Sequence, residues 1–502
     1  MRKSMFNLSL LTGLCMSAIM QAQAWTGEKQ EKPKERVALK YGPITPAHRT
    51  DEAMRKFREY GLGQFIHWGI YAIPGNEWNG VSARGGAAAS EWIRSWSGPT
   101  APKDWKNTYD NLYKQFNPKN FDAKRWAKQA KDMGARYVIF TTKHHDGFAL
   151  WPTKYSAYNI TKTPYKKDIV KQIVDAYDAE GIDVFLYFSI LEWNNPDYLY
   201  KEPQTAEEKA KYSKFLKYTE NQLLELLKNY PQIKGFWFDG TWDASWKSAY
   251  EFTYNLEKKT SRKNIQGLSS VAVSVTMKIK NGTSILTEIC WAIMSRVGNV
   301  SFQKNYESLN GNDWDCVMTI PPNGWGYMKD WNGIYTKTPD DLIEMLMRSR
   351  SMGGNFVINF GPDGNGNFHP EEDKIMKEIG EWTKVNAEAI YNVEHSPMSL
   401  SNYGYFTKKG NNTYLTVFNR PVNQIVRLAV DKKSTEVPSS ASLLTGNRKL
   451  ELKQSDMGLD LDKNTYYDII LPKDYQADKA FVIKIEMKQG SVKTDKLMDA
   501  KM

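Results

Sequence analysis

Strand-like apolar runs alternate with helix-like segments over most of this chain, and this alternation restricts the fold more than any other feature. The runs are short and rich in aromatic and β-branched residues, whereas the segments between them repeat apolar residues at helical spacing. Strands are expected at residues 65–67, 137–143, 183–189, 235–239, 316–320 and 355–360. Alternation sustained over roughly 350 residues predicts parallel βα units and, at this length, an α/β fold closed into an irregular TIM-like barrel.

The pattern changes after about residue 394. Short alternating runs, such as residues 414–418 and 480–485, are separated by Gly, Asn and Pro, which is typical of an antiparallel β-sandwich. We therefore expect three regions after residue 50: a barrel over residues 51–393, a sandwich over residues 394–489 and a disordered tail over residues 490–502.

The N-terminus predicts export. Residues 1–24 combine a basic start at Arg2 and Lys3, a mostly apolar stretch over residues 8–20 and a small-residue cleavage site that ends at Ala24. The apolar stretch is too short for a stable membrane-spanning helix. We expect a signal peptide, a polar lead-in over residues 25–50, and a mature protein that is periplasmic or secreted without membrane insertion.

Composition narrows the class of partner. The net charge is +11, but Lys is scattered among Asp and Glu and no basic cluster alternates with aromatics, so a nucleic-acid partner is not expected. The chain has 17 Trp and 28 Tyr, and flat rings that stack on the C–H faces of sugars favour a carbohydrate substrate, although aromatics also fill cores. Only Cys290 and Cys316 remain after cleavage, which excludes a disulfide framework. The oligomeric state is left open.

Polar residues follow several of the expected strands, just before glycine. One run ends at His67, another is followed by His144 and His145, and a third ends at Asp239. This is the pattern of a barrel enzyme at its catalytic face. A helix N-cap is the alternative for Asp239. Metal binding is the alternative for the paired histidines, but neighbours on a strand point to opposite sides, so we expect no metal unless the backbone bends there.

Six sequence blocks occur in order along the chain: QFIHWG at 64–69, SEW at 90–92, KHHDGF at 143–148, FWFDG at 236–240, WGY at 325–327 and NFGPDG at 359–364. Any one of them alone is weak. Together they resemble the α-L-fucosidases of glycoside hydrolase family 29 over about residues 40–395, with one gap. The resemblance implies a retaining glycosidase that releases terminal fucose from fucosylated glycans without a cofactor.

The resemblance also implies roles for individual residues. Asp239 matches the nucleophile, and retaining hydrolysis needs a second carboxyl about 5–5.5 Å away to protonate the leaving oxygen. Residues matched to sugar binding are the three histidines His67, His144 and His145, the Glu91 and Trp92 pair, and the aromatic wall residue Trp237. Tyr187 is assigned to the same group, although core packing explains it nearly as well.

The gap in the resemblance covers residues about 268–305, where the acid/base should stand. Read one base earlier, the codons of Met277 and Lys278 give glutamate, and the surrounding string becomes polar and family-like. We therefore expect this segment to be out of frame, and a genuine divergent insert is the alternative. Within the printed chain the acid/base is unknown, with Asp315 and Glu288 as weak candidates. A catalytically impaired or non-catalytic sugar-binding product and a β-galactosidase side activity are the alternative functions.

Overall fold

The computed structural model describes residues 52–84, 89–240, 243–247, 274–275, 279–280, 283–284, 314–322, 324–331, 334–396, 398, 401–455, 463–475 and 479–490. The expected signal peptide and lead-in, and all but the first residue of the expected tail, lie outside these ranges. Among the described helices, none has the length and hydropathy that crossing a bilayer requires.

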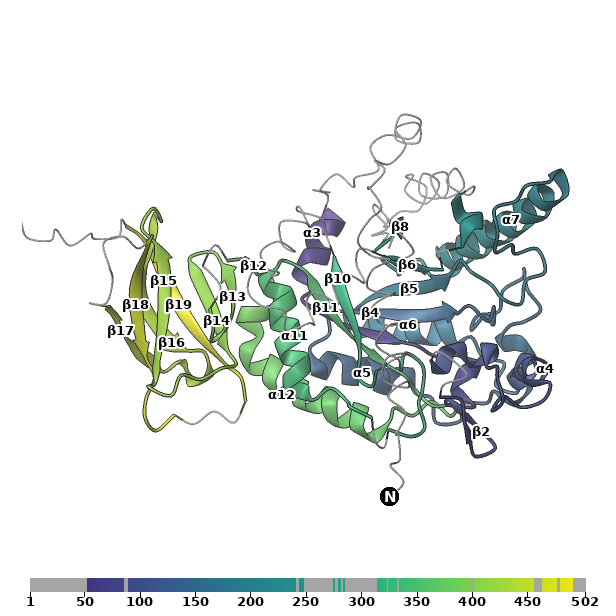
Figure 1. Cartoon of the computed structure of the whole chain (residues 1–502), viewed down its shortest axis with the longest axis horizontal. Helices are drawn as coiled ribbons and strands as arrows, with labels where there is room; N and C mark the ends of the chain where they lie inside the picture. Colours follow the sequence, from purple (N-terminus) through teal and green to yellow (C-terminus); the bar gives the residue numbers. More distant parts are fainter. Residues whose placement is uncertain are drawn as a thin grey trace, which may run out of the picture. The chain divides into compact units, whose positions relative to one another are not determined.

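A seven-stranded parallel sheet forms the wall of the barrel (Figure 1). Its order is β10 (Asp315–Thr319), β11 (Asn355–Phe360), β1 (Leu62–Ile66), β4 (Tyr137–Lys143), β5 (Asp183–Ser189), β6 (Gly235–Asp239) and β7 (Ser274–Val275). Neighbouring strands from β1 through β6 follow chain order, so each crossover returns to the adjacent strand. The six strands expected from the sequence are present, and the predicted α/β barrel class is confirmed.

Helices precede, connect and follow these strands. They are α3 (Glu52–Glu59), α4 (Trp105–Asp110), α5 (Ala123–Met133), α6 (Ile169–Ala179), α7 (Ala206–Asn229), α11 (Pro339–Ser351) and α12 (Pro370–Ile390). Three of them begin with reciprocal caps: Thr205 pairs with Glu208 in α7, Thr338 with Asp341 in α11, and His369 with Glu372 in α12. Each cap satisfies backbone donors that the first turn leaves open, which fixes where the helix begins.

The pleat of the strands decides which side chains face the barrel interior. Strands β1, β4 and β11 are buried along their whole length, as expected for a parallel sheet covered on both faces. An inner cluster contains Phe65, Ile139 and Tyr187, packed against the partly buried Trp237. Because side chains alternate along a strand, His67 follows Phe65 onto this inner face and Asp239 follows Trp237.

The C-terminal strands form the predicted antiparallel sandwich. Their order is β12 (Glu394–His395), β13 (Gly404–Lys409), β14 (Asn412–Val417), β19 (Phe481–Gln489), β16 (Glu436–Leu443), β17 (Lys449–Gln454), β18 (Asn464–Ile470) and β15 (Ile425–Asp431). Leu415 of β14, Leu428 of β15 and Ile483 of β19 share one hydrophobic core, so the strands form two layers that pack against each other. The residue boundaries of the two domains stay predictions.

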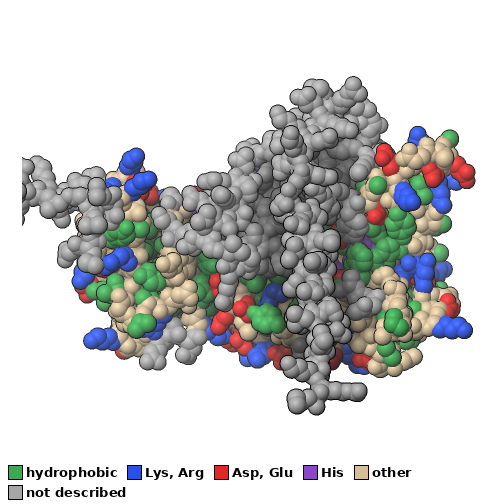
Figure 2. Space-filling model, viewed as in Figure 1, with side chains coloured by type: hydrophobic (Ala, Val, Ile, Leu, Met, Phe, Trp, Pro, Cys, Tyr) green, Lys and Arg blue, Asp and Glu red, His purple; other side chains and the backbone are tan. Residues whose placement is uncertain are grey.

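Short elements complete the described chain. They are the 3₁₀ turns η1 (Ile70–Ala72), η2 (Ser90–Ser95), η3 (Leu112–Gln115), η4 (Ile160–Lys162), η5 (Ala244–Lys247) and η6 (Thr445–Asn447), and the two-residue strands β2 (Glu77–Trp78), β3 (Val81–Ser82), β8 (Ile279–Lys280) and β9 (Thr283–Ser284). On the face in view, Figure 2 shows Lys and Arg side chains interspersed with Asp and Glu over α7, in keeping with the scattered charge of the sequence.

Candidate active site

Asp239 is the last residue of β6 and its carboxylate is held by two donors. Tyr187 Oη donates to Oδ2 at 2.8 Å, and the backbone N–H of Gly240 donates to Oδ1 at 2.8 Å. The side chain is 27% exposed, so a ligand can reach it. Burial raises the pKa of Asp239, and the two hydrogen bonds partly offset that effect because they favour the ionised form. The result is a desolvated, oriented carboxylate suited to nucleophilic attack.

Gly240 explains the sharp turn directly after this carboxylate. Its φ is +95°, a backbone region that favours glycine. A Cβ at this position would lie 2.5 Å from Cβ of Leu191 and 2.8 Å from its backbone nitrogen. The close approach holds the end of β6 against the segment that follows β5.

His67 faces the same interior, and its hydrogen-bond partner fixes its tautomer. Asn359 Nδ2 donates to the carbonyl of Trp325 at 2.7 Å, which leaves Asn359 Oδ1 to accept from His67 Nδ1 at 2.6 Å. Burial lowers the pKa of His67 to about 3, so the ring is neutral near pH 7. With the proton on Nδ1, His67 Nε2 carries a lone pair and can accept a hydrogen bond from a hydroxyl.

His145 is fixed in the same way by a different partner. Ser189 Oγ donates its one hydrogen to the carbonyl of Leu191 at 2.6 Å, so it accepts from His145 Nδ1, also at 2.6 Å. Burial, with the neighbouring His67 and Lys143, lowers the pKa of His145 to about 3. Its Nε2 therefore presents a lone pair, 3.6 Å from Oδ2 of Asp239. A hydroxyl group that lies within hydrogen-bond distance of both atoms, to one side of the line that joins them, can donate to either acceptor.

His144 lies beside these groups and stacks on Tyr187, with ring centroids 5.4 Å apart and planes 7° from parallel. Its Nδ1 is buried and has no hydrogen-bond partner among the described residues. Burial and the two neighbouring histidines lower the pKa of His144 well below its ordinary value. A buried imidazole nitrogen without an internal partner is costly unless a ligand supplies one.

The paired histidines do not lie on a strand, so strand alternation does not keep them from sharing a metal, as was expected. Strand β4 ends at Lys143, so His144 and His145 lie beyond it, with ring centroids only 4.2 Å apart. Donor atoms of both histidines and of Asp239 lie within 4.8 Å of one another, close enough to hold a metal ion. That this centre works without a metal or other cofactor stays a prediction.

Aromatic rings line one side of the carboxylate. Tyr187 stacks on Trp237 with centroids 5.6 Å apart, and Trp237 meets the edge of Phe65 at 5.4 Å. Burial and the adjacent Asp239 raise the pKa of Tyr187 well above its ordinary value, so its hydroxyl stays protonated and donates. The indole Nε1 of Trp237 is buried without a partner among the described residues. Tyr187 thus contacts the carboxylate directly as well as packing in the core.

Glu91 and Trp92 come from η2, outside the strands. Gly326 N donates to Glu91 Oε2 at 3.0 Å, and burial, with the nearby Asp239, raises the pKa of Glu91 to about 7. Trp92 meets the ring of His145 at 5.3 Å and that of Trp193 at 5.1 Å. The structure therefore brings all of the predicted sugar-binding residues to the carboxyl ends of the strands.

Several residues of this site were not among the predicted ones. Ser189 and Asn359 set the two histidine tautomers, and Trp325 lies 5.2 Å from the ring of His67. Asn359 and Trp325 lie within two of the quoted sequence blocks, so those blocks contained a signal for them. Ser189 ends a strand that was predicted, but nothing in its own sequence neighbourhood marks it.

Of the two weak acid/base candidates, only Asp315 lies among the described residues. Asp315 is the first residue of β10, where it accepts from Tyr137 Oη at 3.3 Å. Parallel strands put their first residues at the opposite edge of the sheet from their last ones. Asp315 therefore lies away from Asp239 and does not fit as the acid/base. Glu288 lies outside the described residues, as does most of the segment expected to be out of frame.

Comparison with known proteins gives a consistent picture. Residues 29–388 match the family model described as alpha-L-fucosidase. The tissue alpha-L-fucosidase of Homo sapiens is 26% identical over 490 residues, covering 93% of this chain and 96% of the relative.

Two solved structures are also similar. An alpha-L-fucosidase GH29 from Bacteroides thetaiotaomicron is 37% identical, with a TM-score of 0.78, covering 89% of this chain and 98% of the other. A covalent intermediate of an alpha-L-fucosidase GH29 from the same organism, trapped with 2-fluoro-fucosyl fluoride in a glutamate-to-glutamine mutant, is 38% identical with a TM-score of 0.77, covering 89% and 99%.

Proposed function

Because this chain belongs to the alpha-L-fucosidase family, we propose that it is a retaining α-L-fucosidase that removes terminal α-L-fucose from glycans by double displacement. The observation that carries the proposal is the set of groups around Asp239: one desolvated carboxylate, a tyrosine hydroxyl that donates to it, and two neutral imidazoles that present lone pairs. Adjacent hydroxyls of a sugar can donate to those lone pairs while its anomeric carbon faces the carboxylate.

In the first step Asp239 attacks the anomeric carbon, and the glycosidic C–O bond breaks as its oxygen takes a proton from an acid. In the second step water, deprotonated by the same group, attacks the glycosyl ester and releases fucose and the free carboxylate. Tyr187 stabilises the carboxylate in the free enzyme and shifts its hydrogen bond as charge leaves the oxygen. His67 and His145 orient the sugar, and the aromatic wall with Trp237 packs against its apolar parts.

We assign the acid/base to a residue outside the described part of the chain. We propose that it is a glutamate in the segment about 268–305 when that segment is read in the alternative frame, and Glu288 is the candidate in the printed frame. Sequencing the gene across codons 260–310 separates these. A one-base slip supports the first assignment, whereas an intact printed frame with full activity leaves Glu288 to be tested by Glu288→Gln.

We further infer that the mature protein acts outside the cytoplasm. The support is the basic, apolar and small-residue pattern of residues 1–24. N-terminal sequencing of the protein from its native host tests this. Cleavage after Ala24 is the expected result, and a mature chain that still begins at Met1 would contradict it.

Hydrolysis of an aryl α-L-fucoside, followed by trapping with 2-fluoro-fucosyl fluoride, tests the function. We expect turnover, and a covalent adduct on the peptide that contains Asp239 when the trapped protein is analysed by mass spectrometry. An aryl β-D-galactoside serves as the specificity control and should react more slowly. A folded protein that neither hydrolyses the fucoside nor forms the adduct would overturn the proposal.

A further inference from the structure

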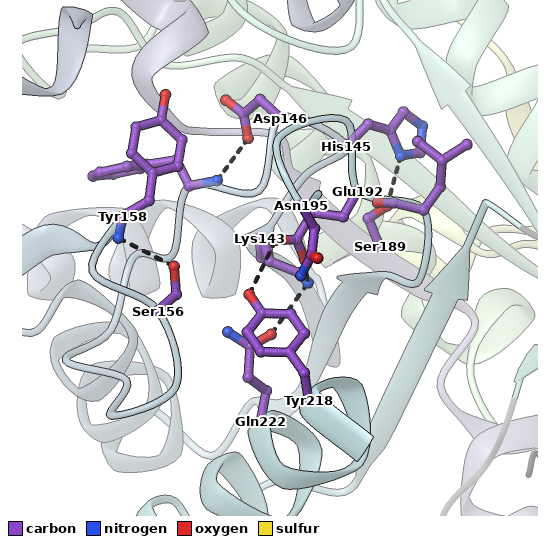
Figure 3. A network of polar contacts seen from close by, with 12 residues as sticks. Lys143, His145, Asp146, Ser156, Tyr158, Ser189, Glu192, Asn195, Tyr218 and Gln222 are labelled. Atoms are coloured by element: carbon purple, nitrogen blue, oxygen red, sulfur yellow. Dashed lines mark hydrogen bonds and ion pairs between the residues drawn. The ribbon is translucent and has the colours of Figure 1, made fainter. Parts of the chain in front are cut away.

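A fully buried ion pair lies behind the active-site histidines. Lys143, at the end of β4, pairs with Glu192, and their side chains are 0% and 5% exposed. Lys143 Nζ also donates to Gln222 Oε1 at 3.1 Å and lies 4.3 Å from the ring centroid of Phe188. The second carboxylate oxygen of Glu192 accepts from Tyr218 Oη at 3.0 Å (Figure 3).

Two of these partners come from the same face of one helix. Tyr218 and Gln222 are four residues apart on α7, so they lie one turn from each other. Glu192 lies in the segment made of the last residue of β5 and the four residues after it, residues 189–193, which we term the 189–193 loop. The ion pair therefore ties three elements together: the end of β4, the 189–193 loop and helix α7.

The 189–193 loop in turn holds His145 at two points. Ser189 Oγ accepts from the ring Nδ1, and Trp193 N donates to the carbonyl of His145 at 2.7 Å. The same loop also holds the nucleophile strand, since Ile190 N donates to the carbonyl of Asp239 at 2.9 Å. The 189–193 loop thus positions both His145 and Asp239, whose Nε2 and Oδ2 atoms lie 3.6 Å apart.

Glu192 also packs directly on the turn after the histidines. Gly147 has a φ of +82°, and a Cβ there would come within 2.9 Å of Cγ of Glu192 and 3.0 Å of its Oε1. Gly147 N closes the turn by donating to the carbonyl of His144 at 3.0 Å. The side chain of Glu192 therefore packs against the turn at Gly147, while the 189–193 loop that carries Glu192 also contacts the ring of His145.

We propose that Lys143 and Glu192 are a positioning pair that fixes the tautomer of His145 and its distance from Asp239. A buried ion pair is a poor device for stability alone, because desolvation of both charges offsets their attraction and an apolar pair of similar size often does as well. We expect the ion pair instead to hold the 189–193 loop in one position. The inference rests on the proposed function only for its kinetic consequence; the tautomer does not depend on it.

Glu192→Gln in the full-length chain is the first test. Glutamine keeps the size of the side chain but removes the charge that Lys143 needs. We expect kcat/KM on an aryl fucoside to fall on the order of 10–100-fold, as when other partners that orient a functional histidine are removed. Tyr218→Phe, which deletes one hydrogen bond to Glu192, should cost about two- to tenfold and serves if the first variant does not fold.

The second readout is the ¹⁵N spectrum of the imidazole nitrogens, which separates the two tautomers without any turnover. Signals are assigned by their loss in His145→Asn and His67→Asn. We expect Glu192→Gln to shift or broaden the signals of His145 and to leave those of His67 unchanged, because Asn359 holds His67 from another strand. His67 is therefore an internal control in every sample.

Two further variants complete the test. In a Ser189→Ala background the effect of Glu192→Gln on kcat/KM should shrink, because both changes act through His145. Asp468→Asn breaks the Arg427–Asp468 ion pair of the sandwich and should leave the kinetics and both histidines unchanged.

A folded Glu192→Gln or Tyr218→Phe protein with wild-type His145 signals would overturn the proposal, and so would equal shifts of His67 and His145. A wild-type chain that neither turns over nor forms the 2-fluoro-fucosyl adduct would instead overturn the proposed function, while the spectra still decide the role of the pair.

Discussion

The barrel sheet carries a buried polar cluster at each end, and the two clusters differ in how completely the protein uses its own polar atoms. At the amino end, Arg350 makes five hydrogen bonds: to the carbonyls of Ile390, Gly354, Val393 and Arg58 and to the amide oxygen of Asn355. At the same end Asp183 accepts from Tyr60 and pairs with Lys56, and Asp315 accepts from Tyr137.

At the carboxyl end, some of the buried polar atoms have no hydrogen-bond partner among the described residues. His144 Nδ1 and Trp237 Nε1 are two of these atoms. In His67 and in His145, Nδ1 donates a hydrogen bond within the protein, which leaves Nε2 of the same ring as an acceptor. Buried polar groups are normally satisfied, so the open atoms beside Asp239 mark a place where a ligand can supply the remaining hydrogen bonds.

The largest expected effect separates two aspartates, one in each cluster. Asp239→Asn removes the nucleophile and should lower kcat on an aryl fucoside on the order of 10⁴-fold or more, because no other group can form the glycosyl ester. Steady-state kinetics measures it, with circular dichroism to check the fold. Asp315→Asn is the matched control and should keep kcat/KM within about twofold; a loss comparable with that of Asp239→Asn would break the distinction between the clusters.

Tyr187→Phe tests the hydrogen bond that belongs to both the core and the site. The ring stacking survives, so the fold should remain, but Asp239 loses a donor and kcat/KM should fall roughly 10–100-fold, the range for a charge-assisted hydrogen bond. Because that donor favours the carboxylate, its loss raises the pKa of Asp239 further. The acid limb of the kcat/KM profile should therefore move to higher pH; an unmoved limb would show that Tyr187 only packs.

Stability against pH tests the cluster at the amino end. Burial raises the pKa of Asp315 to about 6 from an ordinary 3.8, so the folded state binds the proton more tightly than the unfolded state does. This contribution to the free energy of unfolding is present below about pH 4 and is lost as the pH rises through about 6. Asp315→Asn mimics the protonated form and should be more stable than the wild type above pH 6, on the order of 2 kcal/mol by urea unfolding. Equal stability at pH 5 and pH 8 in the wild type would contradict this.

Glu91 should give the smallest effect. Burial raises its pKa to about 7, so above that pH a second negative charge forms near Asp239. We expect the kcat/KM of the wild type to fall across pH 7 and that of Glu91→Gln to stay flat there, a difference of a few-fold (~1 kcal/mol or less). Profiles measured from pH 5 to pH 9 compare the two, and parallel alkaline limbs would exclude Glu91 as their source.

The sequence allowed the strands and the residues at their carboxyl ends to be predicted, because hydrophobic pattern and strand direction are local properties. Ser189 and Asn359 could not be predicted as tautomer-fixing residues, since that role depends on pairing partners 44 and 292 residues away. Asp315 was a mistake that the sequence could have prevented. It begins its strand, whereas the other site residues of the barrel strands lie within the last three residues of their strands or just beyond them.

The tautomers of His67 and His145 also bear on inhibition. Both rings are neutral and turn electron pairs toward a space that already holds a carboxylate, so the local potential there is negative. A five- or six-membered ring that carries a protonated amine in place of the sugar oxygen gains an attraction that the neutral sugar lacks, while its hydroxyls keep the same two acceptors. Medicinal chemistry against this enzyme should therefore start from basic nitrogen rings rather than from neutral sugar analogues.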